Sequence, residues 1–259
     1  MMTKAVVAAV CLIGGALALA SPAAAASPPV VRVIISGGFA AAYQDVLPEF
    51  ERSTGIKVQT GSGASEGVGP KTIRYQLAHG AKADLVILSG EGLATLVQDG
   101  RIREGSQAGL ATAPLAAAVR AGEAAPDVGT DAAFRQAVIA SGHVVMPGST
   151  SGLFIRDKVL PKLDLPQTVT FDLVDRGADV LEALRSGKAN LAIGPTSELA
   201  NAPGVQTVGE LPGDLQLVQT FTAAVTRDAE QPALAARLIA FLLSDRTSAA
   251  LGKAGMKRP

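Results

Sequence analysis

The sequence is poor in the residues that most often bind metals, form disulfides or fill aromatic cores. It has one cysteine, two histidines and no tryptophan, and aromatic residues make up 3% of its 259 residues. Cys11 lies in an N-terminal segment that we expect to be removed, so no disulfide and no cysteine-ligated metal is expected. His79 falls on a predicted helix and His143 opens a predicted strand, which indicates neither a zinc site nor a catalytic triad. We expect no metal and no cofactor.

The chain also lacks an excess of either charge. Lys and Arg number 23, and Asp and Glu number 23. A nucleic-acid-binding protein needs a basic face, so this balance argues against a nucleic-acid partner. Beyond the N-terminus no apolar run reaches the length of a membrane span, because the longest candidate, 234–243, is short and contains Arg237.

The N-terminus has the order of a secretory signal peptide. Lys4 precedes an apolar run over 5–20, and small residues lead to Ala26, after which we expect cleavage. A membrane anchor is the alternative, but Gly14 and Gly15 interrupt the run. The sequence therefore predicts a signal peptide over 1–26 and a periplasmic product of 233 residues, with 22 basic and 23 acidic groups because Lys4 is the only charge removed.

Short apolar strands alternate with helices along the remaining chain. The 39–50 segment places aromatic and aliphatic side chains on one helical face, directly after a β-branched run at 30–35. The expected strands are 30–35, 56–59, 84–88, 143–146, 168–173 and 190–194. The expected helices are 39–50, 72–79, 92–98, 132–140, 153–160, 178–186, 232–243 and 245–253. This alternation predicts an α/β fold with mostly parallel sheets flanked by helices.

Two further extended segments suggest that the chain leaves a first lobe, builds a second and returns. They lie at 115–119 and 215–225, with crossings expected near 113–121 and 214–224. We assign 27–116 plus 220–259 to lobe 1 and 117–219 to lobe 2. The expected architecture is two-lobed, with two hinge crossings, and a monomer is expected.

Four junctions between a strand and the next helix are rich in Gly, Ser and Thr. They are the segments 36–38, 61–65, 148–152 and 194–197. Each can place backbone N–H groups and a hydroxyl at a helix N-terminus, where an anion is favoured. Because the carboxyl ends of strands face the ligand crevice in open α/β sheets, we expect the four junctions to share one site. Helix capping is the alternative for any single junction.

Lys71 and Thr72 begin the second expected helix, with Arg74 three residues later, and these cations are able to donate charge-assisted hydrogen bonds to an anion. A solvated helix face is the alternative. The candidate ligand-binding residues are Ser36, Gly37, Gly38, Ser62, Ser65, Lys71, Thr72, Ser149, Thr150, Ser151, Gly152, Thr196 and Ser197.

Three segments resemble known enzymatic motifs without matching them. Residues 61–67 form a glycine pattern related to the dinucleotide fingerprint, but the acidic residue expected about 20 positions later is missing. In 63–72 Pro70 interrupts a phosphate-binding loop. Thr150 stands where a nucleophile elbow needs serine.

Taken together, these segments resemble the type II periplasmic binding proteins, and among them the molybdate-binding family of ABC-transporter components. The resemblance runs from the Ser36 turn through Ala81-Lys82-Ala83-Asp84-Leu85, the segment 147–160 and Phe241-Leu242-Leu243-Ser244. It implies two lobes that close on an anion, with Ser36 as a hydroxyl donor, the N–H of Ser151 as a donor from the second lobe, and 194–197 as another contact.

The sequence departs from that family's pattern at three places. Pro70-Lys71 stands where the family has a small serine, Pro195 has no N–H to donate, and a tyrosine hydroxyl used by some members has no counterpart in Tyr43 or Tyr75. A lysine suits a carboxylate ligand better than a tetrahedral dianion held by neutral dipoles. Molybdate, another oxyanion and a small organic acid all stay open as ligands.

A neighbouring branch is similar at Ser197-Glu198-Leu199, at 203–205 and at 209–212, and it includes periplasmic aconitate isomerases. Three functions therefore stay open. The first is a solute-binding component that carries a small anion to the membrane permease of an ABC transporter. The second is an isomerase of a tricarboxylate on the same scaffold, in which a base moves a proton between neighbouring carbons. The third is a sensor or chaperone-like partner of a membrane receptor.

Overall fold

Residues 29–259 are described by the computed structural model, and the predicted signal peptide 1–26, with Cys11, lies outside the described residues. The strands are β1 (Val30–Ile35), β2 (Lys57–Ser62), β3 (Leu85–Ser89), β4 (Ala108–Arg120), β5 (His143–Pro147), β6 (Thr170–Val174), β7 (Leu191–Pro195), β8 (Val205–Glu210) and β9 (Val218–Val225). The helices are α1 (Gly37–Thr54), α2 (Ile73–Ala78), α3 (Gly90–Gln98), α4 (Asp131–Ser141), α5 (Thr150–Phe154), α6 (Gly177–Arg185), α7 (Thr196–Leu199), α8 (Pro232–Leu243) and α9 (Ser248–Lys253). Within 29–259, every helix is too short or too polar to span a lipid bilayer.

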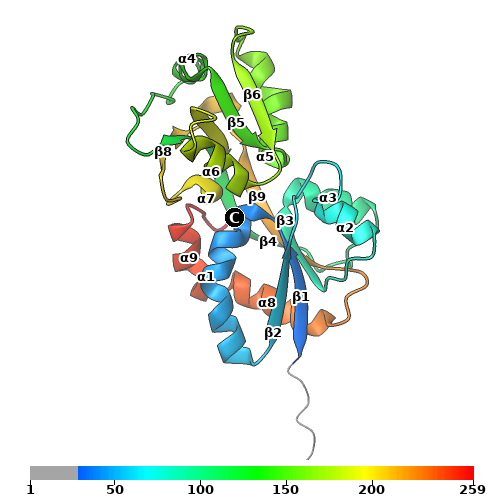
Figure 1. Ribbon diagram of the computed structural model, residues 1–259. Coiled ribbons are helices and arrows are strands. Elements are labelled where there is room, and N and C mark those ends of the chain that lie inside the picture. Colours follow the sequence, from blue (N-terminus) through cyan, green and yellow to red (C-terminus); the bar gives the residue numbers. More distant parts are fainter. Residues whose placement is uncertain (1–28) are drawn as a thin grey trace, which may run out of the picture.

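The chain folds into two α/β lobes that meet at a waist (Figure 1). The strand order is β2-β1-β3-β9-β4-β7-β5-β6, with β8 also paired to β4. Strands β2, β1 and β3 are parallel in one lobe, and β6, β5 and β7 are parallel in the other. This confirms the two-lobed α/β class with parallel strands in each lobe. The antiparallel neighbours are β4, β8 and β9.

Strand β4 connects the two lobes. Its residues up to Pro114 pair with β9 in the first lobe, and from Leu115 onward they pair with β7 in the second. The return crossing precedes β9, where the backbone N–H of Leu115 donates to the carbonyl of Leu217 (3.1 Å). The lobe boundaries at 116 and 220 stay a prediction.

Each sheet has one apolar cluster on each face, as a layered α/β lobe requires. In the first lobe, Phe39, Tyr43 and Phe50 of α1 pack with α8 and α9 on one face, and α2 and α3 cover the other. In the second lobe, α4 and α5 cover one face, and α6 and α7 cover the other. Burying a large apolar side chain contributes about 1.5 to 3 kcal/mol. These clusters stabilise each lobe and so position the junctions between strands and helices.

Three segments differ from the sequence expectation. The extended segment at 115–119 is only the second half of β4, and β8 was not expected at all. The helix expected at 153–160 starts earlier as α5, and then widens into a π-helical turn, Ile155–Val159, followed by a 3-10 turn at Leu160–Lys162. Pro161 lies in that last turn, where it lacks the N–H that a continuing α-helix would use.

Candidate functional site

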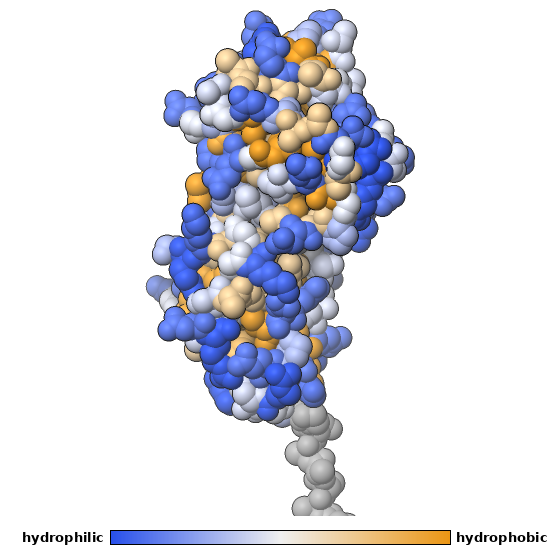
Figure 2. Space-filling model, turned by 90° about the vertical axis from the view of Figure 1, so that its left-hand side faces the viewer, coloured by the Kyte–Doolittle hydropathy of each residue, from blue (hydrophilic) through white to orange (hydrophobic). Residues whose placement is uncertain are grey.

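A pocket of about 800 Å³ lies between the lobes, at the carboxyl ends of the parallel strands. Its walls come from the junctions after β1, β2, β5, β6 and β7, and from two residues of β9. Figure 2 shows pale, weakly polar surface at the level where the lobes meet, between two more hydrophilic ends. The site is therefore built from both lobes at once.

Ser36 occupies the N-cap position of α1, but its side chain makes no capping hydrogen bond. It has the extended backbone of an N-cap, yet its hydroxyl accepts no hydrogen bond from the first turn of α1. A serine at this position usually accepts from an N–H two or three residues on. The Ser36 hydroxyl and the first N–H groups of α1 are therefore available at the pocket wall, since the opening N–H groups of a helix have no partner within it.

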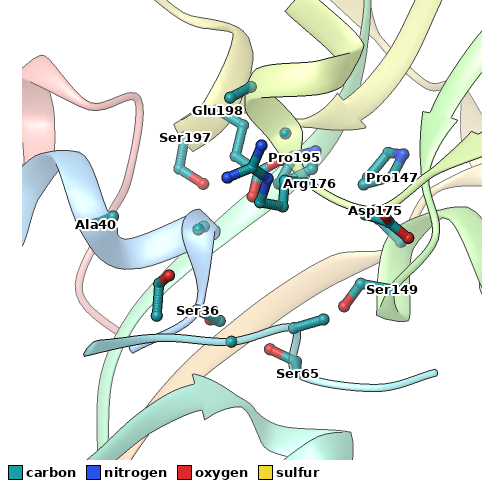
Figure 3. Close-up of a pocket in the computed structure, with 18 of the residues that line it drawn as sticks. Ser36, Ala40, Ser65, Pro147, Ser149, Asp175, Arg176, Pro195, Ser197 and Glu198 are labelled. Atoms are coloured by element: carbon teal, nitrogen blue, oxygen red, sulfur yellow. The ribbon is translucent and has the colours of Figure 1, made fainter. Parts of the chain in front are cut away.

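Ser36 is one of three pocket residues with a buried polar atom that lacks a partner within 29–259. The others are Ser197 and Gln219. Their exposed fractions are 4%, 5% and 4%, respectively. A buried polar atom without a hydrogen bond costs about 1 to 3 kcal/mol, so such atoms need an explanation. All three line the same pocket, and Figure 3 shows Ser36 and Ser197 in it, which indicates that they face a polar guest.

Glu198 brings a carboxyl group into the same pocket, from the lobe opposite to that of Ser36 (Figure 3). A Cβ atom added at Gly37 would lie 2.7 Å from its Oε1, and one added at Gly177 would lie 2.3 Å from its Oε2. The carboxyl group thus lies between the first residues of α1 and α6, close to the backbone of both glycines. Burial raises the pKa of Glu198 to about 7.

The pocket also has a charged side, and each cation there faces a carboxylate. Lys71 pairs with Asp175, which lowers the pKa of that carboxyl. Arg176 pairs with Asp179, 3.2 Å away, which raises the pKa of the guanidinium. These groups are exposed, so a ligand carboxylate is able to compete for the cations at low cost. No group of three His, Cys, Asp or Glu side chains within 29–259 is placed to hold a metal ion.

Nine of the thirteen residues predicted from the sequence line the pocket: Ser36, Gly37, Gly38, Ser62, Ser65, Lys71, Ser149, Ser151 and Ser197. Whether they bind a ligand stays a prediction. Two of these hydroxyls already have partners, because Ser65 accepts from the N–H of Ser89 (3.0 Å) and Ser149 accepts from that of Glu66 (3.4 Å).

The other four predicted residues do not line the pocket. Thr72 caps α2, Thr150 bonds to the hydroxyl of Ser89 (2.8 Å), and Thr196 donates to the carbonyl of Gly255 (3.0 Å). Gly152 lies in α5 against the backbone of Pro147, because a Cβ atom there would lie 1.9 Å from the Pro147 carbonyl oxygen. Arg74 points away, to Asp99 (2.6 Å). For these residues capping and packing explain the Gly, Ser and Thr content.

Sequence reasoning missed the fifth junction, 175–178, and it missed Gln219 and Phe221 of β9. The segment after β6 reads Asp-Arg-Gly-Ala, so it lacks the hydroxyls that marked the other four junctions. Its position directly after a strand and before a helix was the available signal. The β9 residues had no comparable signal in the sequence, because their place in the pocket depends on pairing with strands far away in the sequence.

The lobes contact each other on both sides of the pocket. On one side, Thr150 reaches Ser89, and the Lys71–Asp175 pair joins the two lobes. On the other side, the Asn201 amide donates to the carbonyl of Lys253 (2.7 Å). Side-chain contacts therefore join the two lobes on both sides of the pocket.

Comparison with known proteins agrees with this architecture. The profile of the bacterial extracellular solute-binding protein family matches residues 31–257. An aconitate isomerase from Pseudomonas sp. is 30% identical over 246 residues, which cover 94% of each chain.

Solved structures share the fold at lower identity. The periplasmic molybdate-binding protein of Azotobacter vinelandii has a TM-score of 0.69 at 19% identity, covering 88% of this chain and 99% of its own. The sulfate-binding protein of Mycobacterium tuberculosis has a TM-score of 0.69 at 17% identity, covering 89% and 87%. The chain belongs to the bacterial extracellular solute-binding protein family.

Proposed function

We propose that the protein binds a small anion in the pocket between its lobes and delivers it to the membrane permease of an ABC transporter. The observation that carries the proposal is the Ser36 hydroxyl, buried at the N-terminus of α1 and without a partner within 29–259. A helix N-terminus favours negative charge. The unpartnered side-chain oxygens of Ser197 in α7 and Gln219 in β9 also favour binding of a polar ligand in this pocket.

The size of the pocket favours an organic acid over a tetrahedral oxyanion. Pockets of about 300 to 1,000 Å³ hold whole organic ligands, and this one has about 800 Å³. Lys71 and Arg176 lie on its charged side, where they suit the separated charges of a polycarboxylate. The neighbours that bind molybdate and sulfate keep oxyanions among the candidates.

Transport requires export and lobe closure. The predicted signal peptide and the membership in an extracellular family support a periplasmic location. The contacts between the lobes support closure as a hinge motion at β4 and the segment before β9. Ligand binding would stabilise the closed form, which a permease would recognise.

A thermal-shift screen tests the proposal. The ligands are molybdate, tungstate, sulfate, phosphate, and di- and tricarboxylates, since a ligand that binds only the folded protein raises its melting temperature. For the ligand that does so, calorimetry compares wild type with Ser36→Ala. A hydrogen bond to a charged group is worth about 1.5 to 3 kcal/mol, so affinity should fall at least about tenfold.

The matched control is Ser53→Ala, at the exposed end of the same helix, which should bind as wild type does. Ser36→Ala should also fold at least as stably as wild type, because it removes an unpartnered buried hydroxyl. The proposal is wrong if no anion raises the melting temperature, or if Ser36→Ala binds with unchanged affinity.

An isomerase on the same scaffold is the second candidate function, favoured by the 30% identity to an aconitate isomerase. Glu198 supports it, because a general acid and base works best when its pKa is near the working pH, and burial raises the pKa of Glu198 to about 7. Purified protein would then change the ultraviolet absorbance of trans-aconitate. No change over hours at high protein concentration would exclude this function.

A further inference from the structure

We propose that Glu198 is a specificity-determining residue of the pocket and that it holds a proton against the bound anion, so that each anion binds together with one proton. This proposal rests on the proposed anion binding at the same site. It concerns which ionisation state of the pocket accepts the ligand.

The place of the carboxyl group carries the argument. Glu198 lies on the pocket wall next to Ser197, and its two oxygens touch the backbone of Gly37 and Gly177. Gly37 follows Ser36, whose hydroxyl has no partner among the described residues. An anion bound by Ser36 and Ser197 is therefore a neighbour of the Glu198 carboxyl (Figure 3).

No hydrogen bond or ion pair within 29–259 satisfies that carboxyl group. The basic side chains at the pocket, Lys71 and Arg176, are paired with Asp175 and Asp179 instead. An ionised Glu198 beside a bound anion would place two like charges together in a partly buried site, which is unfavourable. A protonated Glu198 removes the repulsion and gains an O–H donor for the anion.

Other titratable groups do not account for such a proton. The first turn of α1 contains no acidic residue. Helix α6 contributes Asp179, which is paired with Arg176, and the exposed Glu182 and Arg185. Of the strands packed against α7, β4 contributes only Arg120, β7 contributes no charged side chain, and β8 contributes Glu210, which is exposed. Asp175 is held ionised by Lys71. Of the residues that the structure describes, neither His79 nor His143 lines the pocket.

The consequence is a binding affinity that depends on pH in one direction. Burial raises the pKa of Glu198 to about 7 in the unliganded pocket. Above that pH the fraction of protein with a protonated Glu198 falls about tenfold for each pH unit. Because only that fraction accepts the anion, the apparent dissociation constant should rise about tenfold per unit. By reciprocity, the bound anion raises the proton affinity of Glu198.

The experiment measures dissociation constants of sulfate, molybdate and trans-aconitate from about pH 7 to about pH 9, where these probes keep a constant charge. Wild type should weaken about tenfold per pH unit. Glu198→Gln keeps the shape of the side chain and a donor but has no proton to lose, so its affinity should be independent of pH. Glu182→Gln, an exposed carboxyl of α6, is the matched control and should follow wild type.

A second measurement needs no variant. Calorimetry of wild type near pH 8 in buffers of different ionisation enthalpy should report uptake of about one proton per anion bound. Binding without proton uptake, or an equal pH dependence in wild type and Glu198→Gln, overturns the role of Glu198 and leaves the proposed anion binding intact. If no probe binds at any pH, the proposed function itself is wrong, and this inference falls with it.

Discussion

Replacing Glu198 by Gln should make the free energy of unfolding less dependent on pH. In the folded protein burial raises the pKa of Glu198 from its usual 4.5 to about 7. A carboxyl group with a raised pKa binds its proton more tightly in the folded state. Its contribution to stability is therefore complete below about pH 4.5, decreases as the pH rises through 7, and stays constant above that.

The magnitude follows from the difference between the two pKa values. Each pKa unit corresponds to about 1.4 kcal/mol, so the whole difference corresponds to about 3 kcal/mol. The N-termini of α1 and α6 begin at the two glycines that touch the carboxyl group. Each helix end favours the ionised form by about 0.3 to 1 kcal/mol. We therefore expect the net effect to be about 2 kcal/mol.

Urea titrations of wild type and Glu198→Gln at pH 5 and pH 8 measure this effect. The difference in stability between the two proteins should shift by about 1 kcal/mol in favour of the variant on going from pH 5 to pH 8, because part of the whole effect lies below pH 5. Taking the difference cancels the other titrating groups, which the two proteins share. A difference that is the same at both pH values would refute the reasoning, since it would mean that α1 and α6 keep the carboxylate ionised.

Two further predictions concern the scaffold. Gly152→Ala should lower the free energy of unfolding by about 2 kcal/mol or more, because its Cβ would lie 1.9 Å from the carbonyl oxygen of Pro147; Gly252→Ala, with open space in α9, should be neutral or stabilising in the same urea titration. Lys71→Met should leave the melting temperature nearly unchanged, because Lys71 and Asp175 are 64% and 61% exposed and surface ion pairs contribute little. A large loss on Lys71→Met, or none on Gly152→Ala, would contradict these assignments.

Much of the scaffold could be predicted because its signals are local. The β-branched run before α1 and the helical spacing within α1 are patterns of neighbouring residues. The first predicts a strand of the sheet, and the second predicts a helix with one buried face. Strand β8 was missed because it pairs at the sheet edge through a bulge and exposes half of its residues, so it has no clean apolar alternation. Strand β4 was predicted too short, because its first half is rich in Ala, Gly and Thr.

The pocket, like the scaffold, has features that local sequence predicts and features that it does not. The junctions rich in hydroxyls could be identified in the sequence, and eight of the ligand-binding residues predicted in them line the pocket. Which hydroxyls lack a partner depends on contacts across the fold. The Ser65 hydroxyl accepts a hydrogen bond from the N–H of Ser89, whereas the Ser36 hydroxyl has no partner among the described residues. The residues next to each serine in the sequence do not predict this difference.

The junction after β7 explains how a pocket for an anion comes to contain an acid. Pro195 removes one backbone donor, and α7 has only four residues, so this junction contributes little through its own N–H groups. It contributes side chains instead, the hydroxyl of Ser197 and the carboxyl of Glu198. That carboxyl reaches the starts of the longer helices α1 and α6. An incoming anion must therefore share these two helix ends with Glu198, and it does so most readily when Glu198 carries a proton.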